Sequence, residues 1–168
     1  MKFRHPGHRQ LLAGRSGFTI VEMLVTIVII SVLASAVMPM AELTLRRNKE
    51  QDLRRALLQI REALDAYKEA SDKGHIVRQV GESGFPPTLA TLANGVIDAK
   101  SQNGAKLYFL RRIPRDPLNQ DTSLPAEDTW GKRSYESSAI DPKEGRDVYD
   151  IYSLDVRTGM NGIEYKQW

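Results

Sequence analysis

Gly17-Phe18-Thr19-Ile20-Val21-Glu22 places one carboxylate inside an apolar run that is long enough to cross a membrane. The 23 residues from Phe18 to Met40 contain no Lys, Arg or Asp, and Glu22 is their only charged side chain. A helix of roughly 20 residues spans the hydrocarbon core of a bilayer. An unpaired carboxylate at its centre costs about 2.5–3.5 kcal/mol on insertion scales, so we expect Glu22 to have a partner.

The partner of Glu22 is not a basic side chain of the same run, because the run contains none. Cleavage of the chain after Gly17 would give Phe18 a free amino group. Glu22 stands four residues later, which is one helical turn away on the same face. The sequence therefore indicates a processed N-terminus whose amino group balances the buried carboxylate.

The ten residues from Arg15 to Leu24 resemble the prepilin peptidase recognition motif of type IV pilins and type II secretion pseudopilins. The resemblance implies that a basic leader is removed after Gly17 and that the new N-terminal Phe18 is methylated on its amino group. It also implies that Glu22 is required for assembly into a filament. The fold expected from the resemblance is α+β and type IV pilin-like.

The distribution of charge agrees with a short cytoplasmic leader. The chain carries 24 basic and 21 acidic side chains, and residues 1–17 hold four of the basic ones and no acid, namely Lys2, Arg4, Arg9 and Arg15. The rest of the chain is nearly neutral, so its basic character is no sign of nucleic-acid binding. Positive charge before an apolar run predicts that residues 1–17 lie in the cytoplasm and that the C-terminal part lies across the membrane.

Four segments are predicted from these patterns: a leader (1–17), the membrane-spanning half of a long helix (18–40), its amphipathic half (41–74) and a loop-rich periplasmic domain (75–168). The helix should run from about Phe18 to Ser71, with Pro39 bending it and Gly74 ending it. One face of its second half carries an apolar stripe at helical spacing, formed by Leu53, Ala56, Leu57, Ile60, Leu64 and Tyr67.

The domain at 75–168 must cover this stripe. Its strand candidates are 107–110, 130–137 and 147–154, and 88–92 favours a short helical turn. The simplest arrangement is an antiparallel sheet of about three strands packed on the long helix. The chain has no cysteine, which excludes disulfides and cysteine zinc sites.

Further motifs are similar to the major pseudopilin of type II secretion. They recur in the family's order as Ala63–Lys68, Phe85-Pro86, Ile113–Pro117, Trp130-Gly131 with Tyr135, and Asp150–Leu154. This chain interposes residues 118–129 between the proline-aspartate-proline element and the tryptophan-glycine, and we expect an exposed partner contact there. The resemblance implies a filament subunit of the bacterial inner membrane and periplasm. Its implied partners are prepilin peptidase, other copies of itself, minor pseudopilins and the inner-membrane assembly platform.

Calcium is the one cofactor that the resemblance implies, because family members bind it in the loop after the last strand. The ligands available here are Ser153, Leu154, Asp155 and Asn161. Calcium takes six to eight oxygens, and this loop supplies few carboxylates. The alternative, which we favour, is a glycine-rich turn at Asn161 and Gly162 with Tyr165 and Trp168 packed back on the sheet.

No pattern in the sequence argues for an enzyme. His75 is the one histidine outside the leader, with no obvious group to orient it, and no phosphate-binding or dinucleotide glycine pattern occurs. Two other interpretations of the N-terminus stay open: a secretory signal cut after Ala34-Ser35-Ala36, and a plain membrane anchor. Two other functions also stay open: a minor pilin of a type IV pilus system, and a membrane-tethered periplasmic binding domain.

Overall fold

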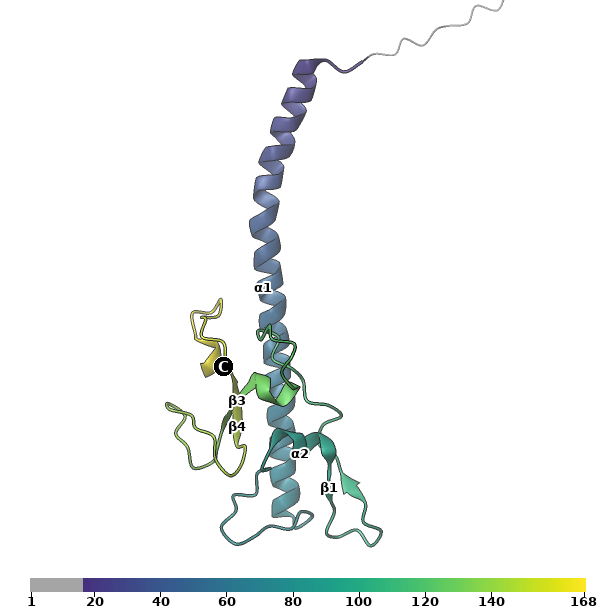
Figure 1. Ribbon diagram of the computed structural model, residues 1–168, viewed down its shortest axis with the longest axis vertical. Coiled ribbons are helices and arrows are strands. Elements are labelled where there is room, and N and C mark those ends of the chain that lie inside the picture. The colour runs from purple at the N-terminus through teal and green to yellow at the C-terminus, as the bar shows by residue number, and fades with distance from the viewer. Residues whose placement is uncertain (1–16) are drawn as a thin grey trace, which may run out of the picture. The chain divides into compact units, whose positions relative to one another are not determined.

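The computed structural model describes residues 17–168, and the chain divides into two compact units, Met1–Leu43 and Thr44–Trp168. The main element is α1 (Ile20–Asp72), a helix of 53 residues (Figure 1). This confirms the predicted long helix. The backbone stays helical through position 39 and ends shortly before Gly74, whose φ of 75° lies in the left-handed region that glycine adopts without strain.

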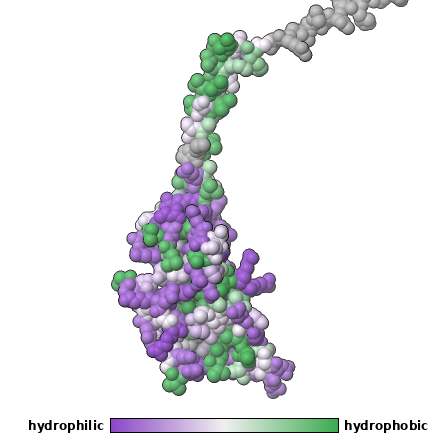
Figure 2. All heavy atoms as spheres, viewed as in Figure 1, coloured by the Kyte–Doolittle hydropathy of each residue, from purple (hydrophilic) through white to green (hydrophobic). Residues whose placement is uncertain are grey.

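The first half of α1 has the surface of a membrane-spanning helix. The apolar side chains from Ile20 to Ser35, and those of Val37 and Met40, are exposed (Figure 2). Among the described residues, α1 is the helix that is long and apolar enough to cross a membrane by length and composition. Three hydroxyls in this stretch donate to backbone carbonyls of the preceding turn: Thr26 to Glu22, Ser31 to Ile27, and Ser35 to Val32. Because lipid offers no hydrogen-bond partners, this internal bonding lets polar side chains sit in an apolar run.

The second half of α1 supplies one wall of the core. All six residues of the predicted stripe, from Leu53 to Tyr67, are buried. They pack with Leu89 and Leu92 of α2 (Leu89–Asn94), with Trp130 and Ile151 of the strands and with Tyr165. The predicted helical turn near 88–92 is confirmed by α2. The periodicity of the stripe therefore located the core correctly.

The strands form two small antiparallel sheets, which corrects the expected single sheet of three strands. β1 (Val96–Ile97) pairs with β2 (Lys106–Leu107), and β3 (Trp130–Arg133) pairs with β4 (Asp150–Ser153). The reason lies in the segment that follows β2. The backbone N–H groups of Phe109 and Leu110 donate to the Leu92 carbonyl at 3.0 and 2.9 Å, so these residues turn against α2 and leave the ladder.

One glycine and one arginine determine how the β3–β4 pair packs. A Cβ at Gly131 would lie 2.4 Å from the ring of its cross-strand partner Tyr152, so this position needs a residue without a side chain. Arg61 of α1 donates through Nε to Asp150 Oδ1 at 2.8 Å. Its Nη2 donates to the Ile151 and Trp168 carbonyls at 3.2 and 2.7 Å. Arg61 thus ties the strand and the C-terminal segment to the long helix.

Residues 118–129 are anchored at both ends and exposed between them. Leu118 is buried, and Thr129 is fully buried at the end of η1 (Ala126–Thr129). Arg115 donates through Nη1 to the Leu124 carbonyl at 2.5 Å and through Nη2 to the Asp121 carbonyl at 2.6 Å. The segment is a closed loop on the surface, and the partner contact expected for it stays a prediction.

Asp116 is a buried carboxylate at the start of that loop, only 2% exposed. It accepts hydrogen bonds from the Ser153 hydroxyl at 2.5 Å and from the Leu118 N–H at 2.8 Å. Burial raises the pKa of the Asp116 carboxyl, and the charge of Asp155 adds to the rise, whereas these two hydrogen bonds oppose it. The folded state therefore disfavours the ionised form.

Leu57 and Leu58 are adjacent leucines of α1 with exposures of 3% and 59%, and they test the assigned core face. Leu57→Ala should lower the free energy of unfolding by about 2–5 kcal/mol because it opens a cavity. Leu58→Ala should change it by less than about 0.5 kcal/mol. Urea unfolding of the detergent-solubilised full chain, followed by tryptophan fluorescence, measures both. Equal losses from the two variants would contradict the assigned face.

Asp116→Asn tests the buried carboxylate through the pH dependence of stability. The pKa of Asp116 is higher in the folded chain than its ordinary value of 3.8 in the unfolded chain. Asp116 therefore contributes its full stabilisation below pH 3.8, and this contribution is lost as the pH rises through the pKa of the folded state. The unfolding free energy of the wild type, relative to Asp116→Asn, should therefore increase from about pH 7 to about pH 4. Asp141→Asn, at an exposed position, is the matched control. If the difference in unfolding free energy between the wild type and Asp116→Asn does not change with pH, a raised pKa of Asp116 in the folded state is contradicted.

Candidate functional site

The predicted cleavage position lies in accessible backbone before the helix. Gly17, Phe18 and Thr19 precede α1 and belong to no helix or strand, and all three are exposed. Phe18 is 77% exposed, and no described atom lies within 4 Å of a Cβ built on Gly17. The Gly17–Phe18 bond thus lies in exposed backbone outside regular secondary structure. The predicted leader falls mostly on residues 1–16, which lie outside the described residues.

Glu22 occupies the first turn of α1 and is exposed. Its backbone N–H donates to Thr19 Oγ1 at 3.1 Å, so Thr19 satisfies one of the free N–H groups at the start of the helix. A carboxylate in the first turn also lies in the favourable field of the helix dipole. Among residues 17–168, no ion pair includes the Glu22 carboxylate. Its methylated partner therefore stays a prediction, as do the roles expected for Gly17 and Phe18.

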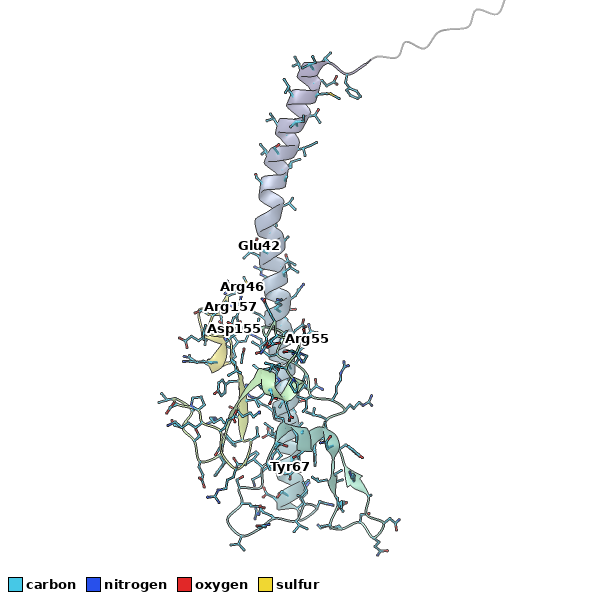
Figure 3. The ribbon with its side chains drawn as sticks, in the orientation of Figure 1. Glu42, Arg46, Arg55, Tyr67, Asp155 and Arg157 are labelled. Atoms are coloured by element: carbon cyan, nitrogen blue, oxygen red, sulfur yellow. The ribbon has the colours of Figure 1, made fainter. Side chains whose placement is uncertain are left out.

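The loop after β4 is closed by an arginine and not by a set of carboxylates. Arg157 Nε lies 3.0 Å from both oxygens of Asp155, and Nη2 lies 2.5 Å from Oδ2 (Figure 3). Hydrogen bonds and charge from Arg157 hold the pKa of the Asp155 carboxyl below its usual range. The guanidinium is thus the cation that faces this carboxylate.

The same loop is tied to α1 through a buried glutamate. Glu50 Oε1 accepts the Met160 N–H at 2.9 Å and the Tyr165 hydroxyl at 2.8 Å. Arg46, one turn earlier, pairs with Glu50 at 3.4 Å and donates to the Thr158 carbonyl. This cluster was not predicted from the sequence. The available signal was that Glu50 stands three residues before Leu53, in helical register with the buried stripe.

The side chains predicted to bind calcium have other partners. The Ser153 hydroxyl donates to Asp116, the Asn161 carboxamide oxygen accepts the Ile163 N–H at 3.1 Å, and Asp155 binds Arg157. Leu154 and Asp155 do line a cavity of about 160 Å³ together with Asp116, Leu118 and Asn119. The described residues contain no group of three or more acidic, histidine or cysteine side chains placed to hold a metal ion. Calcium takes six to eight oxygens, some of which can be backbone carbonyls, and the calcium site expected for this loop stays a prediction.

The C-terminal aromatic residues pack as predicted. Tyr165 is buried, and its ring lies 5.1 Å from that of Trp168 in an edge-on arrangement. The favoured alternative to a metal site included this packing.

His75 does have an orienting partner, contrary to the expectation from the sequence. Its Nδ1 lies 2.9 Å from Asp98 Oδ1. Asp98 also accepts the Lys100 N–H, and the Ala99 N–H donates to the His75 carbonyl at 2.8 Å. Within the described residues, no hydroxyl or other nucleophile is hydrogen-bonded to this histidine. The pair closes a turn after α1, and its geometry lacks the third member of a hydrolytic triad.

Comparison with known proteins gives one family. The model of the prokaryotic N-terminal methylation motif matches residues 12–38. The chain is 30% identical to the type II secretion system core protein G of Pectobacterium carotovorum over 160 residues, which is 90% of each chain. It is 34% identical to the Klebsiella pneumoniae protein of the same name over 64% of this chain and 72% of that one. It is 37% identical to the Escherichia coli K12 protein over 64% and 70%. No solved structure gives a significant match.

These similarities extend from the N-terminal motif through the C-terminal domain and confirm the resemblance drawn from the sequence. The matched motif covers Gly17, Phe18 and Glu22, and the Pectobacterium alignment spans nearly the whole chain. The chain belongs to the type II secretion system core protein G family.

Proposed function

We propose that this chain is a structural subunit of a type II secretion pseudopilus, cut between Gly17 and Phe18 and polymerised through α1. The observation that carries the proposal is the alignment with core protein G over 90% of both chains. The N-terminal methylation motif matches the segment in which an exposed bond is followed by an exposed apolar helix. A catalytic role has no comparable support, and the chain acts by assembling.

The N-terminus supplies the chemistry of assembly. Prepilin peptidase removes the leader, and methylation of Phe18 leaves a positively charged secondary amine. That amine lies against Glu22 of a neighbouring subunit in the apolar interior of the filament. A desolvated opposite-charge pair of this kind is strongly favoured over an isolated buried carboxylate. Pairing therefore selects one axial position for each incoming subunit.

Location and partners follow from the same arrangement. The precursor crosses the inner membrane once, with the leader cytoplasmic and residues 75–168 periplasmic. Subunits leave the membrane at the assembly platform and join other copies and minor pseudopilins. The first half of α1 packs in the interior of the filament, the sheet-bearing domain forms its outside, and filament extension moves folded substrates outward.

We also propose that the loop after β4 works without calcium. Arg157 supplies a permanent positive charge at the carboxylate that a calcium ion would otherwise neutralise, and Glu50 and Arg46 fix the rest of the loop to α1. A guanidinium stays protonated throughout the physiological range, so this closure needs no ion from the medium.

Glu22→Ala should leave leader cleavage and methylation intact and abolish filament formation, because the N-terminal amine loses its buried partner. Intact mass of the protein purified from its own membrane measures processing, and a mature chain starting at Phe18 with one extra methyl group is expected. Electron microscopy of sheared surface or periplasmic fractions measures filaments. Glu42→Ala, an exposed glutamate on the same helix, is the matched control. Normal filaments from Glu22→Ala would refute the pairing argument, and an uncut chain would refute processing.

Chelation of calcium with EGTA should leave the urea unfolding midpoint of the full chain unchanged. Arg157→Ala should lower the free energy of unfolding by about 1–2 kcal/mol, because the Asp155 carboxylate loses its charged partner and keeps the backbone N–H of residue 157. Lys143→Ala breaks an exposed pair with Asp141 and should cost no more than about 1 kcal/mol. A wild-type midpoint that falls in EGTA and recovers with calcium would overturn the proposal.

A further inference from the structure

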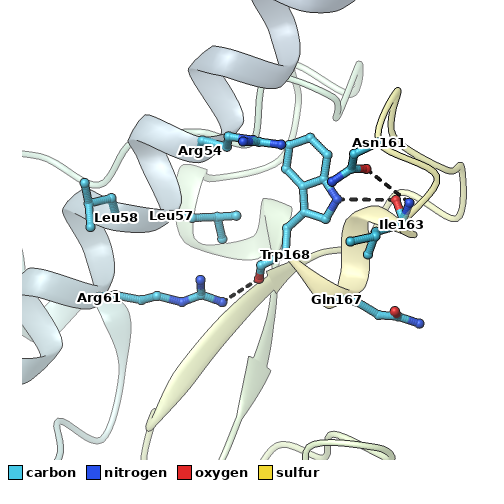
Figure 4. Close-up of a pocket in the computed structure, with 8 residues that line it drawn as sticks. All are labelled: Arg54, Leu57, Leu58, Arg61, Asn161, Ile163, Gln167 and Trp168. Carbon is cyan, nitrogen blue, oxygen red and sulfur yellow. Dashed lines mark hydrogen bonds between the residues drawn. The ribbon is translucent and has the colours of Figure 1, made fainter.

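A groove on the unit Thr44–Trp168 leaves large apolar side chains open to solvent. Its volume is about 310 Å³, and it lies between α1 and the C-terminal segment (Figure 4). Leu57, Leu58, Ile163 and Trp168 form its apolar walls. Leu58 is 59% exposed, although it is adjacent to the buried Leu57. The groove therefore has room and apolar surface for a side chain from outside the subunit.

The shape of the groove is fixed by contacts within the subunit. Arg61 donates through Nη2 to the Trp168 carbonyl at 2.7 Å, and the indole N–H of Trp168 donates to the Ile163 carbonyl at 3.3 Å. The Trp168 ring also lies 5.1 Å from the ring of the buried Tyr165. A preformed groove loses little conformational entropy when it binds.

The groove carries an excess of positive charge. The Cζ atom of Arg54 lies 4.4 Å from the centroid of the Trp168 ring, and within residues 17–168 no ion pair includes Arg54. Arg61 shares the Asp150 carboxylate with Arg133, at 2.8 and 3.2 Å, so one acid faces two guanidinium groups. Of the described residues that line the groove, none is acidic. The groove is thus complementary to an apolar side chain with a carboxylate beside it.

The loop of residues 118–129 offers this combination. It contains three acids and no basic residue, namely Asp121, Glu127 and Asp128. Of its two leucines, Leu118 is buried, whereas Leu124 is 36% exposed. The residues that line the groove include none from this loop, so the loop does not fill the groove of its own subunit.

Glu127 is the acid of this loop that is least engaged within the subunit. Asp121 accepts the N–H and the hydroxyl of Ser123 at 2.9 and 2.6 Å. Asp128 pairs with Lys132 at 3.5 Å. In the part of the chain that the structure describes, no ion pair includes Glu127. Glu127 and Arg54 are therefore opposite charges that each lack an ionic partner in the subunit.

The loop holds Leu124 in place before any partner binds. Arg115 donates to the Leu124 and Asp121 carbonyls at 2.5 and 2.6 Å. Pro125, with a φ of −55°, fixes the backbone directly after Leu124. Binding through this loop therefore costs little ordering of the backbone.

The spacing of the two loop residues matches the spacing of their partners. Arg54 and Leu58 are one turn apart, which is about 6 Å along α1. Leu124 and Glu127 are three residues apart, and a stretch of this length spans roughly 6–10 Å between the 3₁₀ and the extended conformation. One loop can thus reach Leu58 and Arg54 of a groove at the same time.

We propose that the 118–129 loop of one copy binds the groove of a second copy, with Leu124 packed between Leu58 and Trp168 and with Glu127 paired to Arg54. The inference rests on the proposed function, because it names a contact between neighbouring copies. The loop and the groove are different surfaces, so each copy can use its groove for one neighbour and its loop for another. Such a heterologous contact leaves one groove and one loop free at the ends of a row, which is compatible with an open filament.

Leu124→Ser in the full chain, expressed with its own assembly machinery, tests the apolar part of the contact. It should reduce filament yield about tenfold, because the groove loses its apolar occupant. Ile140→Ser is the matched control, since Ile140 is a loop residue that is 95% exposed, and it should assemble normally. Electron microscopy measures the filaments, and an immunoblot of the total subunit normalises the yield.

Charge reversal tests the ionic part of the contact. Arg54→Glu and Glu127→Arg should each reduce filament yield about tenfold, because like charges then face each other. The double variant R54E/E127R exchanges the two signs and should restore most of the yield. Arg111→Glu, at an exposed position outside both surfaces, should assemble normally. Urea unfolding midpoints of the detergent-solubilised variants show whether each one folds.

Cysteine cross-linking tests the geometry, because the chain has no natural cysteine. Leu58→Cys and Leu124→Cys are placed in separate copies that are expressed together, so a link between positions 58 and 124 can only join two copies. A short bismaleimide, which tolerates a wider gap than a disulfide does, should give this mixed product in filaments. Mass spectrometry identifies the linked peptides. Leu58→Cys expressed with Ile140→Cys is the control and should give no mixed product.

The outcomes separate this inference from the proposed function. If the wild type forms filaments and Glu22→Ala does not, the proposed function holds. In that case, normal filaments from Leu124→Ser, no recovery in R54E/E127R, or no 58–124 product would each overturn the contact between loop and groove alone. If the wild type forms no filament under any condition, both fall. Reduced yields in the single variants, recovery in the double variant and the 58–124 product together establish the contact.

Discussion

The packing of residues 75–168 on one stripe of α1 is the constraint on which the rest of the structure depends. The chain has no cysteine and so no disulfide, and within residues 17–168 the two sheets have two strands each, with no strand longer than four residues. Such small sheets are not stable alone in water. Leu53, Ile60 and Leu64 are almost completely buried in the cluster that these loops and strands form with the helix. The helix is therefore the scaffold of the domain as well as its connection to the membrane.

Polar contacts determine where the covering segments attach along that stripe. Arg61, at the middle of the stripe, binds β4 and the C-terminal segment. Glu50 and Arg46, at the N-terminal end of the stripe, bind the last loop. Each of these side chains is charged and bonds to backbone groups from segments about 90 to 112 residues away in the sequence. Hydrophobic burial is nearly indifferent to position, whereas directional hydrogen bonds are not. The arginines and the glutamate thus give the loop-rich domain one arrangement on the helix.

The sequence was sufficient for the features that depend on local periodicity. The helix, its buried stripe, its end before Gly74 and the short α2 all follow from spacing within one or two turns, and the structure confirms them. The pairing of the strands could not be predicted from local spacing. Leu107 to Leu110 has the composition of a strand, yet the Leu92 carbonyl captures two of its N–H groups, and this contact depends on where α2 lies. Similarly, the bond between His75 and Asp98 joins residues 23 positions apart and has no local signal. The residues of the processing motif were identified by resemblance, since an isolated subunit does not contain the contacts that they make.

In a filament of identical subunits, the same rotation and translation carry every subunit to the next, so each contact between neighbours repeats with a multiple of one axial step. The proposed pairing of Glu22 with a neighbour's amino terminus would restrict that step from within the apolar part of α1. Because the two charges of such a pair are desolvated, salt would screen them much less than the charges of an exposed ion pair. A contact of this kind would define the register of each incoming subunit.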